Sequence, residues 1–356
     1  MHDALTGLLQ QQAPVGRGTW RSWWDQLGDN RLDRAEVLAL LASLTSRLPD
    51  HDTLRHLLDS LAERRTPHEA GEVWQGTVNV VGTGGGPRTF NISTASAFVA
   101  AATGVKVVKT GSRAYTSSLG SVDLLERLGV RLTSSYAQTE DTLDAHGIAF
   151  AGPFVYPAQL TRLARTVAPT GLKPFGRFLN ALGPFLAELP VTAQVTGVST
   201  AAPLDTLRQL AGSTRGRRIW LVTNDTGADE LLPFATNTVH GDRGLTRVLR
   251  PGELTPGDGS FADLRPAAGA DEAVRHFRSV LAGTAGAVAT RTVCLGAAAL
   301  AVAAGTRRDW LSAVAEAEEA VRSGAALALA DRLASARPPR PALAGAGARG
   351  PEVARV

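Results

Sequence analysis

Short β-type runs alternate with helical segments along most of this 356-residue chain, and this alternation restricts the fold more than any other feature of the sequence. Strands that are joined through helices pair in parallel, because each helix carries the chain back across the sheet. We therefore predict an α/β fold with a mostly parallel sheet flanked by helices. The predicted strands lie near residues 78–81, 106–108, 130–132, 148–150, 194–198 and 218–223, and the helices between them lie near residues 93–103, 121–128, 139–146, 157–168, 201–211 and 271–282.

A helical section precedes the alternating part of the chain. Asp33, followed three residues later by Glu36, has the spacing of a capping box, and leucines then recur at helical intervals. Residues 1–30 carry a tryptophan cluster and are expected to form an irregular apolar arm. We therefore predict an N-terminal helical domain over residues 1–72, an α/β domain over residues 73–336 that ends in two or three alanine-rich helices, and a disordered tail over residues 337–356.

The composition argues against several classes of protein. There are 37 basic and 33 acidic residues, a net charge of +4, and the basic residues are scattered without interleaved aromatics, which argues against nucleic-acid binding. No run of about 18 apolar residues free of charge is present, so no membrane-spanning helix is expected. The single cysteine, Cys294, excludes a disulfide framework and lies in an alanine-rich stretch typical of a core. Met1–Gln12 lacks the basic region of a secretory signal, so we expect a cytoplasmic protein.

A glycine cluster directly follows the first predicted strand. The cluster is Gly82-Thr83-Gly84-Gly85-Gly86-Pro87, and an alanine-rich helix follows it from about residue 93. Glycines allow positive φ and close approach of the backbone, and a helix N-terminus adds partial positive charge, so the arrangement can bind an anion. Its spacing matches neither a dinucleotide-binding fingerprint nor a Walker A loop. Taken alone, the cluster is compatible with either a phosphate site or a tight structural turn.

Hydroxyl groups and cations gather at the same predicted edge of the sheet. The head of the helix carries three hydroxyls and an amide in Thr89-Phe90-Asn91-Ile92-Ser93-Thr94, where Ser93 or Thr94 alone would suffice as a cap. The next strand ends at Lys109-Thr110-Gly111-Ser112-Arg113, and the following helix opens with Thr116-Ser117-Ser118-Leu119-Gly120-Ser121. Ligands of open α/β sheets bind at the carboxyl ends of strands. We therefore predict a ligand with several phosphate groups.

A resemblance to a known family is carried by Val81–Gly85, by the long stretch Thr89–Ala102 and by Lys109–Asp123. These segments resemble the anthranilate phosphoribosyltransferase family, and the similarity extends from about residue 30 to 335. The resemblance implies a fold of the nucleoside phosphorylase and phosphoribosyltransferase type, in which a small helical domain, with a contribution from about residues 165–190, joins a larger α/β domain. It also implies a homodimer formed through the helices. The implied reaction is magnesium-dependent transfer of a phosphoribosyl group from phosphoribosyl pyrophosphate to the amine of anthranilate.

The resemblance also implies where the ligands would bind. The phosphoribosyl donor would be held by two glycine- and hydroxyl-rich turns, with two cations that stabilise charge, at Gly82, Gly85, Gly86, Thr89, Asn91, Ser93, Thr94, Lys109, Gly111, Arg113, Ser117 and Ser121. Mg²⁺ would contact Ser93 and the pair Asp229-Glu230, which precedes the similar Thr236-Asn237-Thr238-Val239. This fits the preference of Mg²⁺ for oxygen ligands that bridge to phosphates. A solvated acidic turn is the alternative interpretation of the pair.

Most departures from the family pattern lie on the acceptor side. In the glycine loop, Gly86-Pro87 stands where the family has an aspartate, while Thr110 and Ser112 replace a histidine and an asparagine that contact the acceptor. The arginine that would hold the anthranilate carboxylate is missing near Thr170-Gly171, and Val222-Thr223-Asn224-Asp225 replaces a Val-His-Gly strand end. We predict that the small-molecule acceptor differs from anthranilate, or that anthranilate is held in another way, because a bidentate arginine contact is strong and directional. The predicted acceptor subsite consists of Thr110, Ser112, Thr170 and Arg177, the last of which matches a family arginine only across a one-residue gap.

Three other functions stay open. One is the related nucleoside phosphorylase reaction, which the Thr89–Thr94 stretch disfavours. Another is a non-catalytic nucleic-acid-binding relative, which requires a coherent basic groove. The third is an inactive homologue of the same fold. No catalytic base is expected for a neutral amine, and His146, which precedes Gly147, is interpreted as a helix end.

Overall fold

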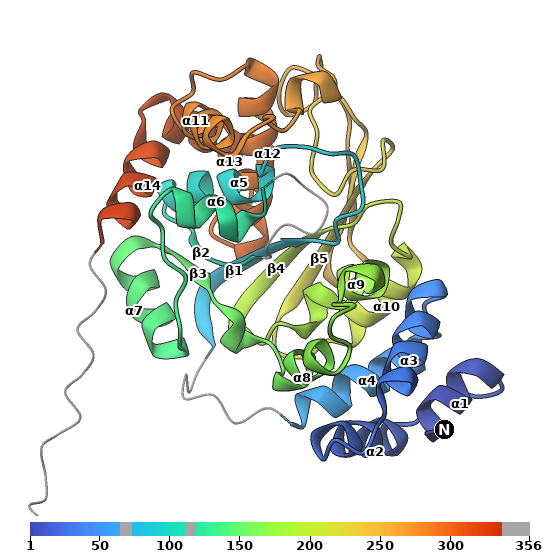
Figure 1. Ribbon diagram of the computed structural model, residues 1–356. Coiled ribbons are helices and arrows are strands. Elements are labelled where there is room, and N and C mark those ends of the chain that lie inside the picture. The colour runs from blue at the N-terminus through green and yellow to red at the C-terminus, as the bar shows by residue number, and fades with distance from the viewer. Residues whose placement is uncertain (65–72, 112–118, 337–356) are drawn as a thin grey trace, which may run out of the picture.

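The computed structural model describes residues 1–64, 73–111 and 119–336, and a seven-stranded sheet lies at its centre. The strand order is β3-β2-β1-β4-β5-β6-β7, in which β3 to β5 pair in parallel and the last two strands pair antiparallel. The strands are β1 (Trp74–Gly82), β2 (Lys106–Thr110), β3 (Ile148–Ala151), β4 (Val191–Gly197), β5 (Arg218–Asn224), β6 (Asn237–His240) and β7 (Thr246–Leu249). The predicted α/β fold with a mostly parallel sheet is therefore confirmed (Figure 1).

Helices cover both faces of this sheet (Figure 1). One face carries α5 (Ile92–Ala102), α6 (Ser121–Arg127), α11 (Ala270–Leu281), α12 (Ala287–Ala304), α13 (Trp310–Arg322) and α14 (Ala325–Ser335). The opposite face carries α7 (Tyr136–His146), α9 (Gly176–Leu186) and α10 (Leu204–Ser213). Cys294 is fully buried in α12, where burial raises the pKa of its thiol to about 12, so the predicted core role is confirmed.

Helix α12 is, in the part of the chain that the structure describes, the one helix long and apolar enough to cross a membrane by length and composition. Of its residues, 78% are buried inside the fold, where the helix packs between α5, α13 and the sheet. A buried alanine-rich helix of this kind is expected in the core of a large α/β domain, so its apolar composition follows from packing.

Helices α5 and α12 approach closely at Gly296, where a Cβ would lie 2.9 Å from the Cβ of Ser96. We expect Gly296→Ala to lower the free energy of unfolding by about 1–3 kcal/mol, because overpacking forces neighbouring atoms to shift. Chemical denaturation measures this loss, and adding Ser96→Gly should recover part of it. Gly212→Ala in α10 is the matched control, since no atom lies within 4 Å of the added Cβ. Equal losses at the two glycines would contradict the packing explanation.

The N-terminal residues form four helices, so the prediction of an irregular arm over residues 1–30 is wrong. The helices are α1 (Asp3–Gln10), α2 (Arg17–Gly28), α3 (Arg34–Ser46) and α4 (His51–Ala62). On α2, the indole N–H of Trp20 donates to the Thr53 carbonyl (3.2 Å), and that of Trp24 donates to the Ser60 hydroxyl (2.9 Å). The tryptophans at i, i+3 and i+4 form one face of α2, and this face packs on α4. The packing stabilises α2 despite the low helix propensity of the glycines in it.

Helices α8 (Ala158–Thr166) and α9 pack into the same apolar cluster as α1–α4. The guanidinium of Arg34 at the start of α3 also donates to the Thr170 hydroxyl (2.7 Å). We propose on this ground that α8 and α9 complete the N-terminal helical unit. The predicted tail over residues 337–356 lies outside the described residues.

Two local predictions about strands differ from the structure. Residues 130–132 form no strand, and Thr133 makes only a single parallel bridge to Ala151. Strands β6 and β7 were not predicted, because each is four residues long and their apolar residues are few. These two strands extend the sheet beyond β5. The chain re-enters the sheet at β6, after the loop that carries the Asp229–Glu230 pair.

Two predicted helix caps also differ in detail. The Asp33 carboxylate accepts a hydrogen bond from the Glu36 N–H (2.7 Å), as a helix cap requires, but the Glu36 carboxylate accepts from the main chain of His2 and leaves the capping box incomplete. Ser121 is the first residue of α6, and Gly120 occupies the cap position. The Ser121 side chain is therefore not needed as a cap.

Candidate active site

A cavity of about 420 Å³ opens at the carboxyl ends of β1 and β2, between the start of α5 and helix α9. Parallel strands place the loops that follow them at this edge, where open α/β sheets bind ligands. Seven residues predicted to hold the phosphoribosyl donor line the cavity together, namely Gly82, Thr89, Asn91, Ser93, Lys109, Gly111 and Ser121. Of the remaining predicted site residues, Ser112, Arg113 and Ser117 lie outside the described part of the chain.

The glycine loop after β1 presents Thr83 and Gly84 to the cavity, whereas Gly85 and Gly86 do not line it. Gly84 and Gly85 have φ of 61° and 81°, which turn the chain toward the segment that follows β4. The Ser199 hydroxyl there donates to the Gly84 carbonyl (2.6 Å), and a Cβ on Gly86 would lie 3.3 Å from the Cβ of Ser199. Gly85 and Gly86 thus pack against the neighbouring loop, and their role in donor binding stays a prediction.

The polar residues at the start of α5 separate into two groups. Asn91 is the N-cap residue, but its amide donates to the Leu119 carbonyl (3.4 Å) and makes no capping bond. The Ser93 hydroxyl faces the cavity and lies 3.3 Å from Nζ of Lys109. Thr94 is fully buried, and its hydroxyl has no partner. The prediction that Thr94 contacts the donor is not supported, because one helical step of about 100° turns it into the core.

Lys109 places a buried ammonium group at the end of β2, with only 4% of the residue exposed. Its Nζ donates to the Val80 carbonyl (3.2 Å) and to the Ser93 hydroxyl (3.3 Å), and it forms no ion pair with any described residue. Burial lowers the pKa of Lys109 to about 8, against the opposing effect of the Asp229 charge. A lysine has three N–H donors, so one stays available for an anion in the cavity.

Two paired glycines make room for Asp229 above the sheet. Gly82 and Gly197 lie opposite each other in register at the ends of β1 and β4, and a Cβ on either residue would overlap Asp229. The N–H of Gly84 donates to Asp229 Oδ2 (2.8 Å). Glycines at the two strand ends therefore bring a carboxylate from the loop after β5 directly over the sheet edge.

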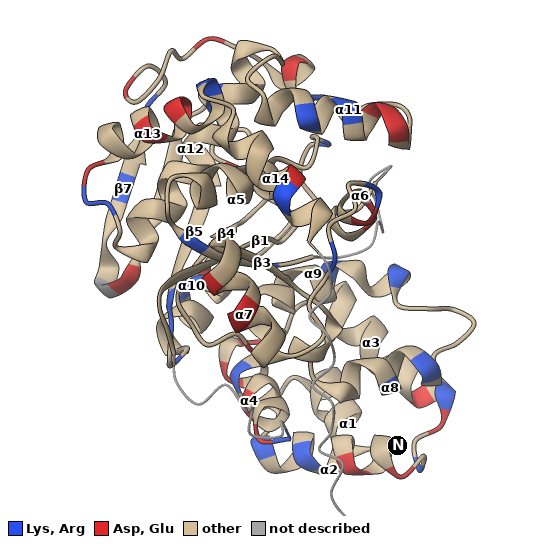
Figure 2. Cartoon of the chain, turned by 90° about the vertical axis from the view of Figure 1, so that its left-hand side faces the viewer, with Lys and Arg blue, Asp and Glu red and all other residues tan. Residues whose placement is uncertain are grey.

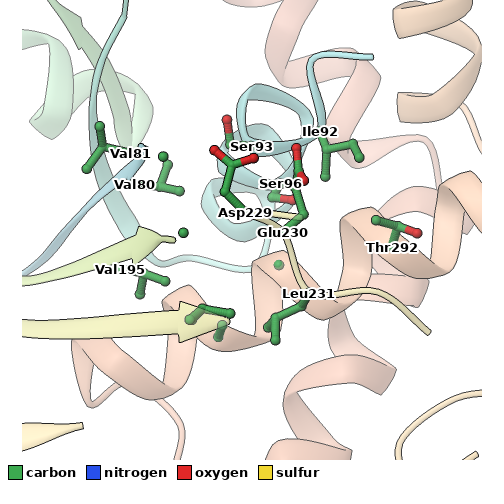
Figure 3. Close-up of a pocket in the computed structure, with 15 residues that line it drawn as sticks. Val80, Val81, Ile92, Ser93, Ser96, Val195, Asp229, Glu230, Leu231 and Thr292 are labelled. Carbon is green, nitrogen blue, oxygen red and sulfur yellow. The ribbon is translucent and has the colours of Figure 1, made fainter. Parts of the chain in front are cut away.

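Glu230 lies beside Asp229, and Figure 3 shows the two carboxylates directed to the same side, next to Ser93. The Thr89 hydroxyl donates to Glu230 Oε1 (2.9 Å), while Oε2 is buried without a partner. Burial raises the pKa of Asp229, and burial together with the adjacent Asp229 charge raises the pKa of Glu230 well above its ordinary value. Two close carboxylates with a free buried oxygen attract a cation.

This arrangement suits a magnesium ion. Mg²⁺ is usually bound by one or two carboxylates plus water and substrate phosphates, and it prefers oxygen ligands. Asp229, Glu230 and Ser93 supply such oxygens, and the unpartnered Glu230 Oε2 is a position that a cation would satisfy. No group of three or more His, Cys, Asp or Glu side chains that could hold a metal ion occurs among the described residues. A cation shared between this acidic pair and a phosphorylated ligand therefore fits better than a site built by the protein alone.

Helix α9 forms the wall of the cavity opposite the glycine loop. Arg177 donates to the Ser46 carbonyl on α3 (3.4 Å), and Thr170 accepts from Arg34, so neither residue lines the cavity. Both residues thus contact the helical unit, and their predicted acceptor contacts stay a prediction. The cavity is lined instead by the face of α9 at i, i+3, i+4 and i+7, namely Gly176, Leu179, Asn180 and Gly183.

The predicted acceptor residue Thr110 lies in the cavity and hydrogen-bonds to the phenol of Tyr156, whose pKa burial raises. Sequence reasoning missed Tyr156, although it follows β3, whose carboxyl end lies at the same sheet edge. It also left Lys173 without a role, and Lys173 lies on the cavity wall with Leu172. This end of the cavity combines an aromatic residue, aliphatic side chains and one exposed cation.

The fold and this site define a glycosyltransferase. The model of the glycosyl transferase family, a/b domain, matches residues 75–327. Anthranilate phosphoribosyltransferase from Methylorubrum extorquens (strain PA1) is 32% identical over 331 residues, which are 92% of this chain and 96% of that relative. The enzyme of Geobacillus kaustophilus (strain HTA426) is 31% identical over 303 residues, 84% of this chain and 87% of that relative.

Solved structures agree with these relatives. The crystal structure of anthranilate phosphoribosyltransferase from Thermus thermophilus has a TM-score of 0.78 at 27% identity and covers 93% of this chain and 98% of that chain. The fold of the Saccharomyces cerevisiae enzyme in complex with PRPP and Mg is also similar, with a TM-score of 0.72 at 22% identity over 89% of this chain and 91% of that chain. The chain belongs to the anthranilate phosphoribosyltransferase family and is a phosphoribosyltransferase.

Proposed function

We propose that this protein transfers the phosphoribosyl group of phosphoribosyl pyrophosphate to a small aromatic amine in a reaction that requires Mg²⁺. The observation that carries the proposal is the convergence of Lys109, Ser93 and the Asp229–Glu230 pair on one cavity. A magnesium-bound pyrophosphate presents both signs of charge, and the cavity offers a cation for the phosphate and carboxylates for the metal.

The chemistry requires positioning and charge stabilisation more than a catalytic base. The bond between ribose C1 and the pyrophosphate oxygen breaks, the amine nitrogen bonds to C1, and the nitrogen then releases a proton to solvent. Mg²⁺, held by Asp229, Glu230 and Ser93, would neutralise charge on the departing pyrophosphate. The Lys109 ammonium stabilises the same charge, and its buried surroundings strengthen that interaction. The described lining residues include no histidine, and a neutral amine needs none as a base.

We further propose that the acceptor is recognised without an arginine clamp. The described lining residues include no arginine, and Lys173 supplies a point charge that cannot bind a carboxylate through a planar fork. Tyr156, Leu172 and Leu179 give this end of the cavity an aromatic and aliphatic surface. An aromatic amine whose carboxylate is absent, or contributes little to binding, suits this surface.

Incubation with Mg²⁺, phosphoribosyl pyrophosphate and a panel of aromatic amines tests both proposals. We expect pyrophosphate release to require the metal and an amine, with at least one uncharged amine used about tenfold or more efficiently than anthranilate. The reason is that a buried charge pair contributes about 2–5 kcal/mol, and the described lining residues supply no buried cation for the carboxylate at the acceptor end. A preference for anthranilate would contradict the acceptor proposal alone, while no release with any amine would contradict the transferase proposal.

An inactive or nucleic-acid-binding homologue is the alternative function. A nucleic-acid-binding relative needs a coherent basic groove, whereas Figure 2 shows blue and red residues mixed over the face that it presents. Salt-dependent DNA binding without pyrophosphate release would favour that alternative.

As the family resemblance implies, we also propose a homodimer formed through the helical unit and a cytoplasmic location. Light scattering of the purified protein tests the dimer.

A further inference from the structure

The loop that carries the acidic pair has an asparagine at each end. Asn224 ends β5 and Asn237 begins β6, and the two residues face each other in the antiparallel register of these strands. Both carboxamides bond to the main chain of the loop over residues 225–236. The shape of the loop thus depends on two side chains that lie outside the acidic pair itself.

Asn224 uses both ends of its carboxamide. Its Oδ1 accepts from the N–H (3.1 Å) and the hydroxyl (2.6 Å) of Thr226 and from the N–H of Ala228 (3.2 Å). Its Nδ2 donates to the carbonyls of Ala228 (3.2 Å) and Glu230 (2.7 Å). The peptide groups that precede Asp229 and follow Glu230 are therefore both bound by one side chain.

Asn237 fixes the other side of the pair. Its Oδ1 accepts from the N–H of Leu232 (2.8 Å), and its Nδ2 donates to the carbonyls of Leu232 (2.8 Å) and Ala235 (2.9 Å). Asn237 is only 4% exposed, and Leu232 is fully buried, so these bonds are shielded from water. Hydrogen bonds in such surroundings are costly to leave unmade, which makes the loop conformation rigid.

The acidic pair needs this support because the main chain of the loop determines where the two carboxylates point. Asp229 and Glu230 are adjacent residues of one loop, and Figure 3 shows both carboxylates directed to the side of Ser93. If the main chain of the loop were flexible, the carboxylate oxygens of Asp229 and Glu230 would no longer be held toward the same cation. Hydrogen bonds from Asn224 and Asn237 satisfy the main chain without a metal and hold both carboxylates toward Ser93.

We propose that Asn224 and Asn237 are positioning residues that hold Asp229 and Glu230 in place for Mg²⁺ before the ion binds. This inference rests on the proposed role of the acidic pair. Asn224 belongs to the segment that replaces the Val-His-Gly strand end of the family, and a glycine there has no carboxamide to make these bonds. The two asparagines together form a clamp on the loop over residues 225–236.

Variants of Asn224 test the clamp, with two measurements on the full-length protein. The first is the Mg²⁺ concentration that gives half-maximal pyrophosphate release, and the second is hydrogen exchange of residues 225–236 without metal. For Asn224→Ala we expect the half-saturating Mg²⁺ concentration to rise about tenfold to a hundredfold, as on loss of a residue that supports a metal ligand, with kcat recovered at saturating Mg²⁺. Exchange of the loop amides should also become faster.

Asn224→Asp and Thr238→Ala complete the design. The aspartate keeps the size and one acceptor oxygen, but its second oxygen would face the carbonyls of Ala228 and Glu230 with no proton to donate. Faster loop exchange is therefore expected for this variant too, which keeps the test available if the alanine variant folds poorly. Thr238 follows Asn237 and points to the other face of the sheet, so its replacement should change neither measurement. Unchanged Mg²⁺ dependence and unchanged exchange in folded Asn224 variants would overturn the proposal. If the wild-type protein releases no pyrophosphate, the proposed function fails, while exchange still tests whether the asparagines hold the loop.

Discussion

Pyrophosphate release is expected to fall about a thousandfold or more when Asp229→Asn and Glu230→Gln are combined. Metal-ion stabilisation of a developing charge contributes several kcal/mol, and each 1.4 kcal/mol corresponds to about a tenfold change in rate. Both substitutions keep the shape of the side chains and the oxygens that accept from Gly84 and Thr89. The loss should therefore reflect the missing charge rather than a rearranged loop, and steady-state assays over a range of Mg²⁺ concentrations measure it.

The same double variant should be more stable than the wild type in the absence of metal. Burial raises the pKa of both carboxyls, so the folded state holds their protons more tightly than the unfolded state. The associated stability is present at low pH and is lost as pH rises through the raised pKa values. Thermal unfolding should thus show that the advantage of the variant grows as pH rises above the ordinary carboxyl range.

Asp225→Asn is the matched control for the acidic pair. Asp225 lies in the same loop and is exposed, and its carboxylate accepts a hydrogen bond from the Thr236 N–H (3.2 Å). An asparagine oxygen can accept the same bond, so activity and Mg²⁺ dependence should stay at the wild-type level. Retention of full activity by the Asp229→Asn and Glu230→Gln double variant would remove the acidic pair from the mechanism.

The second large effect concerns Lys109→Met, which should weaken binding of phosphoribosyl pyrophosphate about thirtyfold to several thousandfold. Removing one partner of a buried charge pair costs about 2–5 kcal/mol, and the phosphate would lose its buried cation. Without ligand, the same variant should unfold at a higher temperature near neutral pH, because Lys109 buries a charge that pairs with no described carboxylate. Calorimetric titration and thermal unfolding measure the two opposite effects.

Lys106→Met is the matched control, since Lys106 lies on the same strand but is exposed and pairs with Asp144. It should leave donor binding unchanged, because its ammonium lies on the surface. The pKa of Lys109 is lowered to about 8, so kcat/KM for the donor should decline as pH rises through that value and the lysine loses its proton. Equal donor affinity in both lysine variants would contradict the assigned role of Lys109.

The sequence alone predicts the fold and brings seven of the proposed donor-binding residues to one cavity, because both depend on local patterns. The alternation of strands and helices defines a parallel sheet, in which Lys109 lies at the end of β2 and Ser93 follows β1, and these two strand ends share one edge. The acidic pair was located only through the family resemblance. Its approach to the sheet edge depends on the paired glycines at Gly82 and Gly197, which are far apart in the chain.

Other parts of the site depend on geometry that no local pattern specifies. Arg177 lies on the side of α9 that contacts α3, where it donates to the Ser46 carbonyl, whereas the face with Leu179 and Asn180 lines the cavity. Gly86 packs against Ser199 because two loops interlock through the Gly84 carbonyl. In the sequence, Asn224 is visible only as a departure from a family pattern. Its proposed role depends on five hydrogen bonds that exist only in the folded loop.

Calorimetric titration of phosphoribosyl pyrophosphate into the wild-type protein, with and without Mg²⁺, tests most directly whether the cavity holds this donor. We expect saturable binding at one site per chain that Mg²⁺ strengthens, that Lys109→Met weakens severely and that Lys106→Met leaves intact. No binding, or binding that is indifferent to Mg²⁺ and equal in the two lysine variants, would show that the cavity at the ends of β1 and β2 is not the donor site.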